Sequence, residues 1–335
     1  MKSWATLRAA AILLAALTRA ALSDAAEPAA PEPPVEGAAS APVVNDDRNI
    51  HLLLGQTWEN DEETFAVEVS FERRLTDWLS LEAGYDNEGH VEGHHRDSVA
   101  LQLFAQRRFW SERLRLRIGV GPQLYFDTQN SNNFTSDTDA HGIGVLGTVA
   151  AEVEVSHGIF AEARANGAVD QNDFSAGQVL LGLGYHLGPP EPVAPPSAGW
   201  NLRFTLLGGL SVRNSLAEEK GAALMVGVGR DAIVSVVGAS LSYLRLGSDD
   251  NRQGAALLIS AEEHFFDNWL IIGAGVGPYL YSDSGGGSTE AGVAGLMGPK
   301  LACEIVAGID AVVLLMREFG HRDYDLVLGG FSAEF

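Results

Sequence analysis

The segment at positions 86–97, DNEGHVEGHHRD, is the most unusual in this sequence because it gathers histidine and acidic side chains. Imidazole and carboxylate groups together bind Zn²⁺ and other divalent cations. The candidate ligands in this segment and in the next polar stretch are Glu88, His95, Asp139 and His141. We expect a divalent cation, if one binds, to bind at these loops, and we expect no other cofactor.

The same region contains the residue types of a nucleophilic catalyst. A base, an acid that orients the base and a nucleophile would be supplied by His90, His94, Asp97 and Ser98. Polar loops are most often simply solvated. The matching loop of the second half, GSDDNRQG, contains no histidine. An enzyme is therefore the less favoured hypothesis.

The start of the chain favours export. Lys2 and Arg8 flank a short apolar run, and small residues follow, which is the order of a secretory signal peptide ending near residue 25. The run is too short for a spanning helix, which needs about 20 residues. The mature chain also has no apolar run of that length.

The net charge of the whole sequence is −22. Removing residues 1–25 takes away three cationic side chains and one anionic side chain, so the mature net charge is −24. Such a chain repels phosphate, and we exclude nucleic acid as a partner. Cys303 is the only cysteine, so no intrachain disulfide forms.

Apolar residues recur at every second position over most of the chain. Phe65, Val67 and Val69, for example, alternate with small or charged residues. This period places one set of side chains on each face of a sheet. The runs are about ten residues long, as a tilted strand needs to cross a bilayer. Because short turns alternate with long polar loops, we predict an all-β, antiparallel transmembrane β-barrel.

Aromatic residues beside the short turns are typical of a membrane girdle. They are Trp78, Phe109, Trp110, Trp200, Phe265, Phe266 and Trp269. The last strand, LVLGGFSAEF, ends on Phe335 and resembles the terminal-strand signal of bacterial outer-membrane proteins. That resemblance implies location in an outer membrane, insertion by the barrel-assembly machinery, and contact with outer-membrane lipid and lipopolysaccharide.

The sequence also contains an internal repeat. GVGPQLYFDT at 119–128 returns as GVGPYLYSDS at 275–284, an offset of 156 residues, and we count eight strands in each half. We predict two tandem eight-stranded barrels, with one sixteen-stranded barrel as the alternative. The expected organisation is a signal peptide at 1–25, a Pro/Ala-rich linker at 26–48, a barrel at 49–188, a Pro-rich linker at 189–199 and a barrel at 200–335.

Acidic and arginine side chains share the predicted inner face of the first half, where they would pair and plug a narrow lumen. These residues are Glu68, Glu72, Glu82, Arg115, Arg117, Glu152, Glu162 and Arg164. In the second half, Gly273, Gly275 and Gly277 alternate in step with Trp269 and Tyr279, and a mixture of small and large residues indicates a filled interior.

In strand count and size the chain resembles small eight-stranded outer-membrane barrels, some of which are lipid A acyltransferases or deacylases. The His-x-Ser-Asn pattern of the deacylases is absent. We therefore expect a structural or surface-interaction role, in which acidic loops contact lipopolysaccharide phosphates through divalent cations. The alternatives are a lipid A-modifying acyl hydrolase or acyltransferase and, third, a sixteen-stranded pore for small solutes.

Overall fold

The computed structural model describes residues 47–59, 62–91, 94–110, 113–130, 137–156, 158–170, 175–189, 202–213, 220–234, 237–247, 251–267, 269–284, 290–320 and 323–335. The predicted signal peptide at 1–25, nearly all of both predicted linkers, and Trp200 lie outside these residues. Within them, no helix has the length and apolar character needed to cross a membrane.

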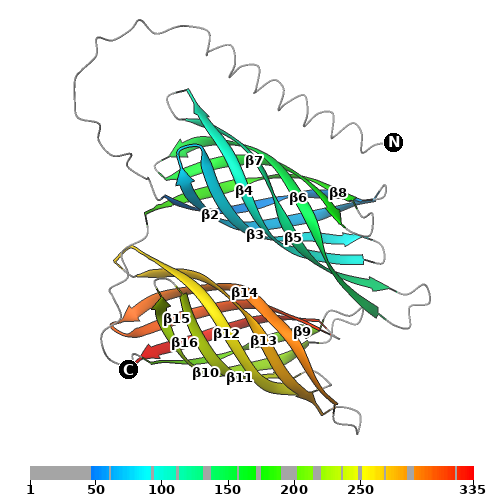
Figure 1. Ribbon diagram of the computed structural model, residues 1–335, viewed down its shortest axis with the longest axis vertical. Helices are drawn as coiled ribbons and strands as arrows, with labels where there is room; N and C mark the ends of the chain where they lie inside the picture. Colours follow the sequence, from blue (N-terminus) through cyan, green and yellow to red (C-terminus); the bar gives the residue numbers. More distant parts are fainter. Residues whose placement is uncertain are drawn as a thin grey trace, which may run out of the picture. The chain divides into compact units, whose positions relative to one another are not determined.

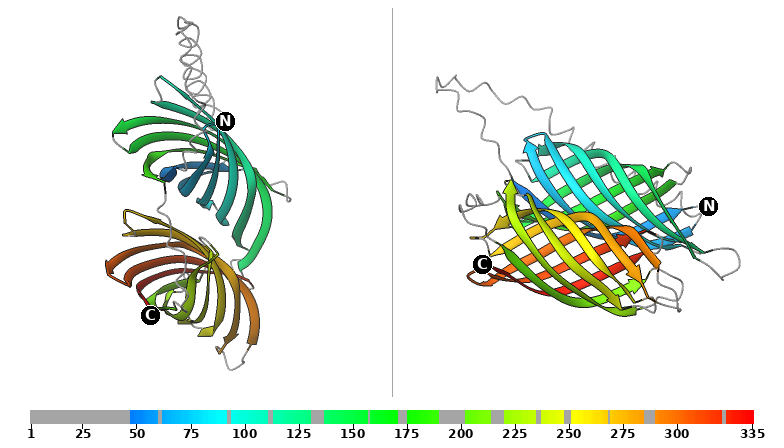
Figure 2. Two further views of the ribbon diagram at one scale, coloured as in Figure 1. Left: turned by 60° about the vertical axis from the view of Figure 1, so that its left-hand side comes forward. Right: turned by 60° about the horizontal axis from the view of Figure 1, so that its bottom comes forward.

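The described residues form sixteen antiparallel strands in two groups of eight (Figures 1 and 2). The first group is β1 (Arg48–Glu59), β2 (Glu62–Thr76), β3 (Leu79–Val91), β4 (His94–Phe109), β5 (Leu114–Asn130), β6 (Asp137–Ser156), β7 (Ile159–Asp170) and β8 (Ser175–Gly188). The second is β9 (Arg203–Arg213), β10 (Lys220–Val234), β11 (Val237–Gly247), β12 (Arg252–Phe265), β13 (Leu270–Asp283), β14 (Glu290–Val306), β15 (Ile309–Phe319) and β16 (Tyr324–Glu334).

Each group closes on itself. Strand β1 pairs with both β2 and β8, and β9 pairs with both β10 and β16. Closure leaves neither sheet a free edge, so the first barrel has no strand available to accept β9. The prediction of two tandem eight-stranded barrels is confirmed, and the alternative of one sixteen-stranded barrel is wrong.

Alternation along the strands separates a lipid-facing surface from a lumen. On β1, Leu52 and Leu54 are 55% and 48% exposed, whereas His51 and Leu53 between them are buried. The same contrast recurs in the second barrel, where Leu241 is exposed and Leu244 is buried. An outward apolar band on a closed sheet is the arrangement of a transmembrane barrel.

The short turns carry exposed aromatic side chains, as predicted for Trp78, Trp110, Phe266 and Trp269. The prediction for Phe265 is wrong, because this ring is buried inside the second barrel, with 1% exposed. Trp269 lies outside the lumen, so it does not share the inner face of Tyr279, which is fully buried.

The two longest expected loops of the first half are largely strand. Pairing between β3 and β4 continues through Asn87 with Asp97 and Val91 with His94. Likewise β5 runs to Asn130 and β6 begins at Asp137. Extended pairing satisfies backbone groups that a long loop would leave to water. Because the paired strands are longer than a membrane crossing requires, both hairpins project beyond the apolar band.

The two barrels have matching strand registers. The repeated ten-residue segments lie in β5 and β13, the fifth strand of each barrel, and these strands begin 156 residues apart at Leu114 and Leu270. The turns before β7 and β15 both contain a glycine with positive φ, Gly158 at 76° and Gly308 at 79°. The pairings of the remaining strands agree as well, so interior positions within the strand segments that both barrels share have counterparts in the other barrel.

We expect residues 49–188 and 200–335 to fold separately in detergent, because each strand finds both of its neighbours within its own half. Folding is measured as a mobility difference between unheated and heated samples and as protease resistance. A chain of residues 49–174, which lacks β8 and leaves two open edges, should remain protease-sensitive. The prediction fails if either half becomes resistant only when both are refolded together.

Candidate functional site

A cluster of ionisable side chains fills the middle of the first barrel, and we call it the lumen network. None of its members is more than 4% exposed. They point inward because they alternate with lipid-facing residues on six strands. The members are His51, Glu68, Glu72, Glu82, Arg115, Arg117, Glu152, Glu162 and Arg164. All eight inward acids and arginines predicted from the sequence are among them.

Two arginines of β5 bridge acids from opposite sides of the lumen. Arg115 donates to both carboxylate oxygens of Glu72, at 3.0 and 2.8 Å, and also pairs with Glu152. Arg117 donates to Glu152 at 2.8 Å and to Glu82. A planar guanidinium offers five donors, so each arginine serves several carboxylates at once.

The third arginine, Arg164 on β7, donates to Glu82 at 2.6 Å, to Glu162 at 2.7 Å, and to Glu68. The ring of Phe104 stacks against the network, with the guanidinium carbon of Arg117 4.0 Å from the ring centre. Stacking on an aromatic face adds to the stability of a desolvated cation. The result is a packed, cross-linked lumen.

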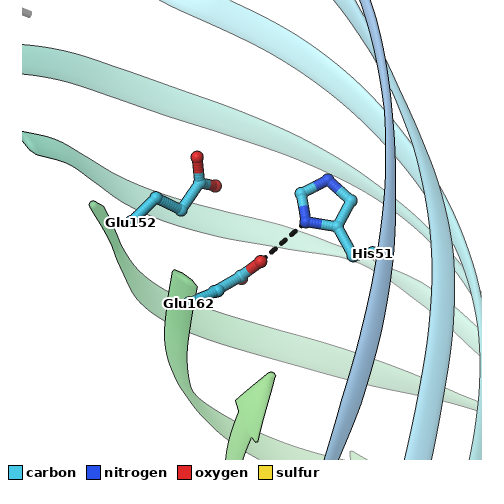
Figure 3. Close-up of side chains that lie close together, drawn as sticks. All are labelled: His51, Glu152 and Glu162. Atoms are coloured by element: carbon cyan, nitrogen blue, oxygen red, sulfur yellow. Dashed lines mark hydrogen bonds and ion pairs between the residues drawn. The ribbon is translucent and has the colours of Figure 1, made fainter. Parts of the chain in front are cut away.

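His51 of β1 reaches into this network, but it was not among the predicted site residues because it is a single histidine between lipid-facing residues. Its Nδ1 lies 2.6 Å from Glu162 (Figure 3). Its Nε2 lies 3.4 Å from Glu72 and 3.9 Å from Glu82. Two groups of buried side chains therefore have the composition of a metal site. They are His51 with Glu72 and Glu82, and His51 with Glu152 and Glu162.

The lumen network carries an excess of negative charge. Its five carboxylates face three guanidiniums, which leaves two negative charges when His51 is neutral. Buried charge is costly unless it is compensated. Because His51 lies among these acids, an additional positive charge at its position would stabilise the first barrel.

The loop-end candidates are divided between the two faces of the barrel. Ser98 and Glu88 point into the lumen, where Gln123 donates to them at 2.6 and 3.0 Å. Asp97 points outward and accepts hydrogen bonds from Tyr85 at 2.9 Å and from an amide. Consecutive strand residues face opposite sides, so Asp97 and Ser98 do not come together as orienting acid and nucleophile.

The other predicted site residues lie at the same end. His90 belongs to β3, His94 and His95 belong to β4, and Asp139 belongs to β6, but their side chains lie outside what the structure describes. His141 is exposed, and its ring meets Phe126 edge-on at 5.6 Å. Because the side chains of His95 and Asp139 lie outside the described residues, the cation site of Glu88, His95, Asp139 and His141 stays a prediction.

The second barrel has no ionisable residue at any position equivalent to the lumen network. The counterparts, in the same order, are Thr205, Met225, Gly229, Ser240, Ile271, Gly273, Ala302, Val312 and Leu314. An apolar core occupies much of this lumen, with Leu207, Met225, Leu244, Tyr279, Leu296 and Leu328 among its buried members. A Lys300–Glu262 ion pair at 2.8 Å lies beside Gly273, the counterpart of Arg117. The nine positions of the lumen network are ionisable in the first barrel and non-ionisable in the second, although the backbone registers are the same.

One interior feature does persist in both barrels, near the loop end. Arg96 stacks on Tyr125 at 4.2 Å in the first barrel, and Arg252 stacks on Tyr281 at 3.8 Å in the second. Each pair is separated from its counterpart by 156 residues. Each arginine also pairs with an acid on the seventh strand, Asp170 at 3.1 Å and Glu318 at 2.7 Å. We call this feature the arginine–tyrosine cap.

Comparison with known proteins adds little beyond the fold. No protein-family model matches the sequence, and no curated protein matches it. Among solved structures, it is similar to the N-terminal β-barrel domain of Pseudomonas aeruginosa OprF, with 15% identity over 42% of this chain and 98% of that one and a TM-score of 0.36. It is also similar to Neisserial surface protein A (12%, 42% and 95%, TM-score 0.34) and to Ail, the attachment invasion locus protein of Yersinia pestis (11%, 42% and 96%, TM-score 0.33). The strand pairing establishes the two barrels independently of these similarities.

Replacing Arg117 with leucine should lower the free energy of unfolding of the first barrel by about 3 to 5 kcal/mol, because it leaves buried carboxylates without their cation. Urea unfolding in lipid vesicles measures the change. The control is Arg245→Leu, since exposed Arg245 contacts only Asn251 among the interactions described, and its effect should stay within about 0.5 kcal/mol. Equal effects of the two substitutions would contradict the assignment.

Asp86 is a buried acid whose two carboxylate oxygens have no hydrogen-bond partner among the described residues. Its counterpart in the second barrel is the buried Leu244. The Asp86→Leu substitution should therefore raise the free energy of unfolding by about 1 to 3 kcal/mol, which is the usual cost of an unsatisfied buried polar group. The same urea titration tests this, with Asp77→Leu at an exposed turn as the control; a lower stability would contradict it.

Proposed function

We propose that this protein is a non-conducting outer-membrane barrel protein with a structural and surface-interaction role. The observation that carries the proposal is that both lumens are filled. Outer-membrane lipid and lipopolysaccharide are the partners that its outer surface would contact.

The filled lumens argue against transport. A water-filled pore exposes the side chains that line it, whereas the lumen network is at most 4% exposed. In the second barrel the equivalent level is occupied by buried side chains such as Met225, Ile271, Val312 and Leu314, and by the Lys300–Glu262 ion pair beside Gly273. Eight strands enclose an interior only wide enough for side chains to fill. Neither barrel therefore has the free cross-section that a solute pore needs.

The loop end of the first barrel supports a surface role. Strand β6 has 20 residues, which at about 3.3 Å each and a tilt of about 40° span roughly 50 Å along the axis. The apolar band of such barrels is only about 25 Å tall. The outward face also changes in character, from the exposed Leu101 and Leu103 on β4 to the exposed His141 on β6. These strands therefore present a rigid polar surface beyond the membrane.

We expect the refolded full-length mature protein to be electrically silent in a planar bilayer, because both lumens are occupied. Insertion is verified by heat-modifiable mobility and protease protection before recording. Large, regular, salt-dependent steps from inserted wild-type protein would overturn the proposal.

A widened lumen provides the matched control. Phe104 and Arg117 are among the largest fully buried side chains, and replacing both with alanine should produce small, irregular conductance that wild type lacks. The corresponding exterior control, Leu101→Ala with Leu103→Ala, removes comparable side-chain volume from the lipid face and should remain silent.

A further inference from the structure

We propose that the first barrel binds one divalent transition-metal cation of the Zn²⁺ type inside its lumen. The ligands are Nε2 of His51 and the carboxylates of Glu72 and Glu82. These residues come from β1, β2 and β3, three adjacent strands whose pairing places the side chains on one patch of the inner wall. This site is distinct from the loop residues to which the sequence pointed.

The separations between ligand atoms suit a tetrahedral ion. Zn²⁺ binds imidazole nitrogen and carboxylate oxygen at about 2.0 to 2.2 Å, so neighbouring ligand atoms around it lie roughly 3.3 to 3.5 Å apart. The distance from Nε2 to Glu72 is 3.4 Å, and from Nε2 to Glu82 it is 3.9 Å. The candidate ligand atoms of the group all lie within 4.8 Å of one another. An approach of Glu82 to Nε2 by about half an ångström brings this pair of ligand atoms to the spacing of two tetrahedral corners.

The orientation of the imidazole is that of a metal ligand. A carboxylate only accepts hydrogen bonds, so the contact with Glu162 places the proton on Nδ1. Nε2 is buried and has no hydrogen-bond partner among the described residues. A histidine that ligates a metal usually donates its other N–H to a carboxylate in this way. Glu162 is therefore a positioning residue, and in the neutral form of His51 the Nε2 lone pair faces the two acids.

The charges of the network also favour a cation at this point, although guanidiniums already contact both acids: Arg117 pairs with Glu82 and lies 3.6 Å from one oxygen of Glu72. Glu72 and Glu82 are directly opposite one another on adjacent strands, an arrangement in which like charges repel. With neutral His51, the lumen network has two negative charges in excess, and one divalent ion neutralises them. Borderline divalent cations prefer this mixture of imidazole and carboxylate, whereas Ca²⁺ and Mg²⁺ prefer oxygen alone.

The second barrel provides an internal negative control. The counterparts of the three ligands are Thr205, Gly229 and Ser240, which cannot form such a site. The proposal therefore fixes the stoichiometry at one ion per chain. Because the ligands are buried, the ion would enter while the barrel folds.

The test is to refold the full-length mature chain in detergent with Co²⁺ or Zn²⁺, remove unbound metal, and measure the metal content. We expect about one ion per chain, and for Co²⁺ the intense visible absorption of tetrahedral coordination, displaced by Zn²⁺. The His51→Gln variant should lose both signals. Glu162→Gln should weaken binding about 10- to 100-fold, as expected for a group that orients a ligand.

The control variant is His141→Gln, which removes an exposed imidazole at the loop end and should keep the full metal content. If His51→Gln does not fold, Glu82→Gln tests the same site, and mobility shift on heating reports folding for each. Absence of bound metal in folded wild type would overturn the proposal and leave a protonated His51 as the compensating cation. Loss of metal in His141→Gln, with retention in His51→Gln, would also overturn it by moving the site to the loops.

Discussion

The structure depends on the need to satisfy backbone hydrogen bonds where there is no water. A sheet in lipid is stable only without free edges, and here each half of the chain meets this need by pairing its first strand with its eighth. Closure after eight strands sets the width of the lumen and therefore how much side-chain volume must fill it. The outer face must be apolar because it contacts lipid. Side chains of different character can therefore be accommodated mainly in the lumen.

The two barrels have the same strand register but fill the middle of the lumen with different kinds of side chain. In the first, three arginines and five glutamates cross-link the wall, and the geometry has to be accurate because each unmatched charge is costly. In the second, an apolar core with Leu244, Tyr279 and Leu328 fills the space, and such a core needs mainly the correct volume and shape. The arginine–tyrosine cap is common to both, so the loop end of the lumen is closed in the same way whichever interior lies below it.

Much of this architecture could be predicted from the sequence because the side-chain period of a strand is two. Alternation identifies the strands, the inner face with Arg115 and Glu152, and the repeat that places β5 and β13 at the same position. The metal-like grouping around His51 could not be predicted. It joins positions more than 100 residues apart, such as His51 and Glu162. These residues meet because only β8 lies between β1 and β7, and the strand tilt and register bring them to the same level. The extent of the loops was missed as well, because polar residues near His94 do not reveal whether their backbone remains paired.

The matching registers have a use beyond this protein. Two barrels in a single polypeptide are exposed to one ionic strength and one refolding reaction, and they differ in whether the positions of the lumen network are ionisable. Exchanging counterparts such as Arg117 and Gly273, or Arg164 and Leu314, moves a piece of one interior into the other without changing the overall composition. The second barrel can thus serve as the internal reference when the contribution of the lumen network to the free energy of unfolding in a membrane is measured.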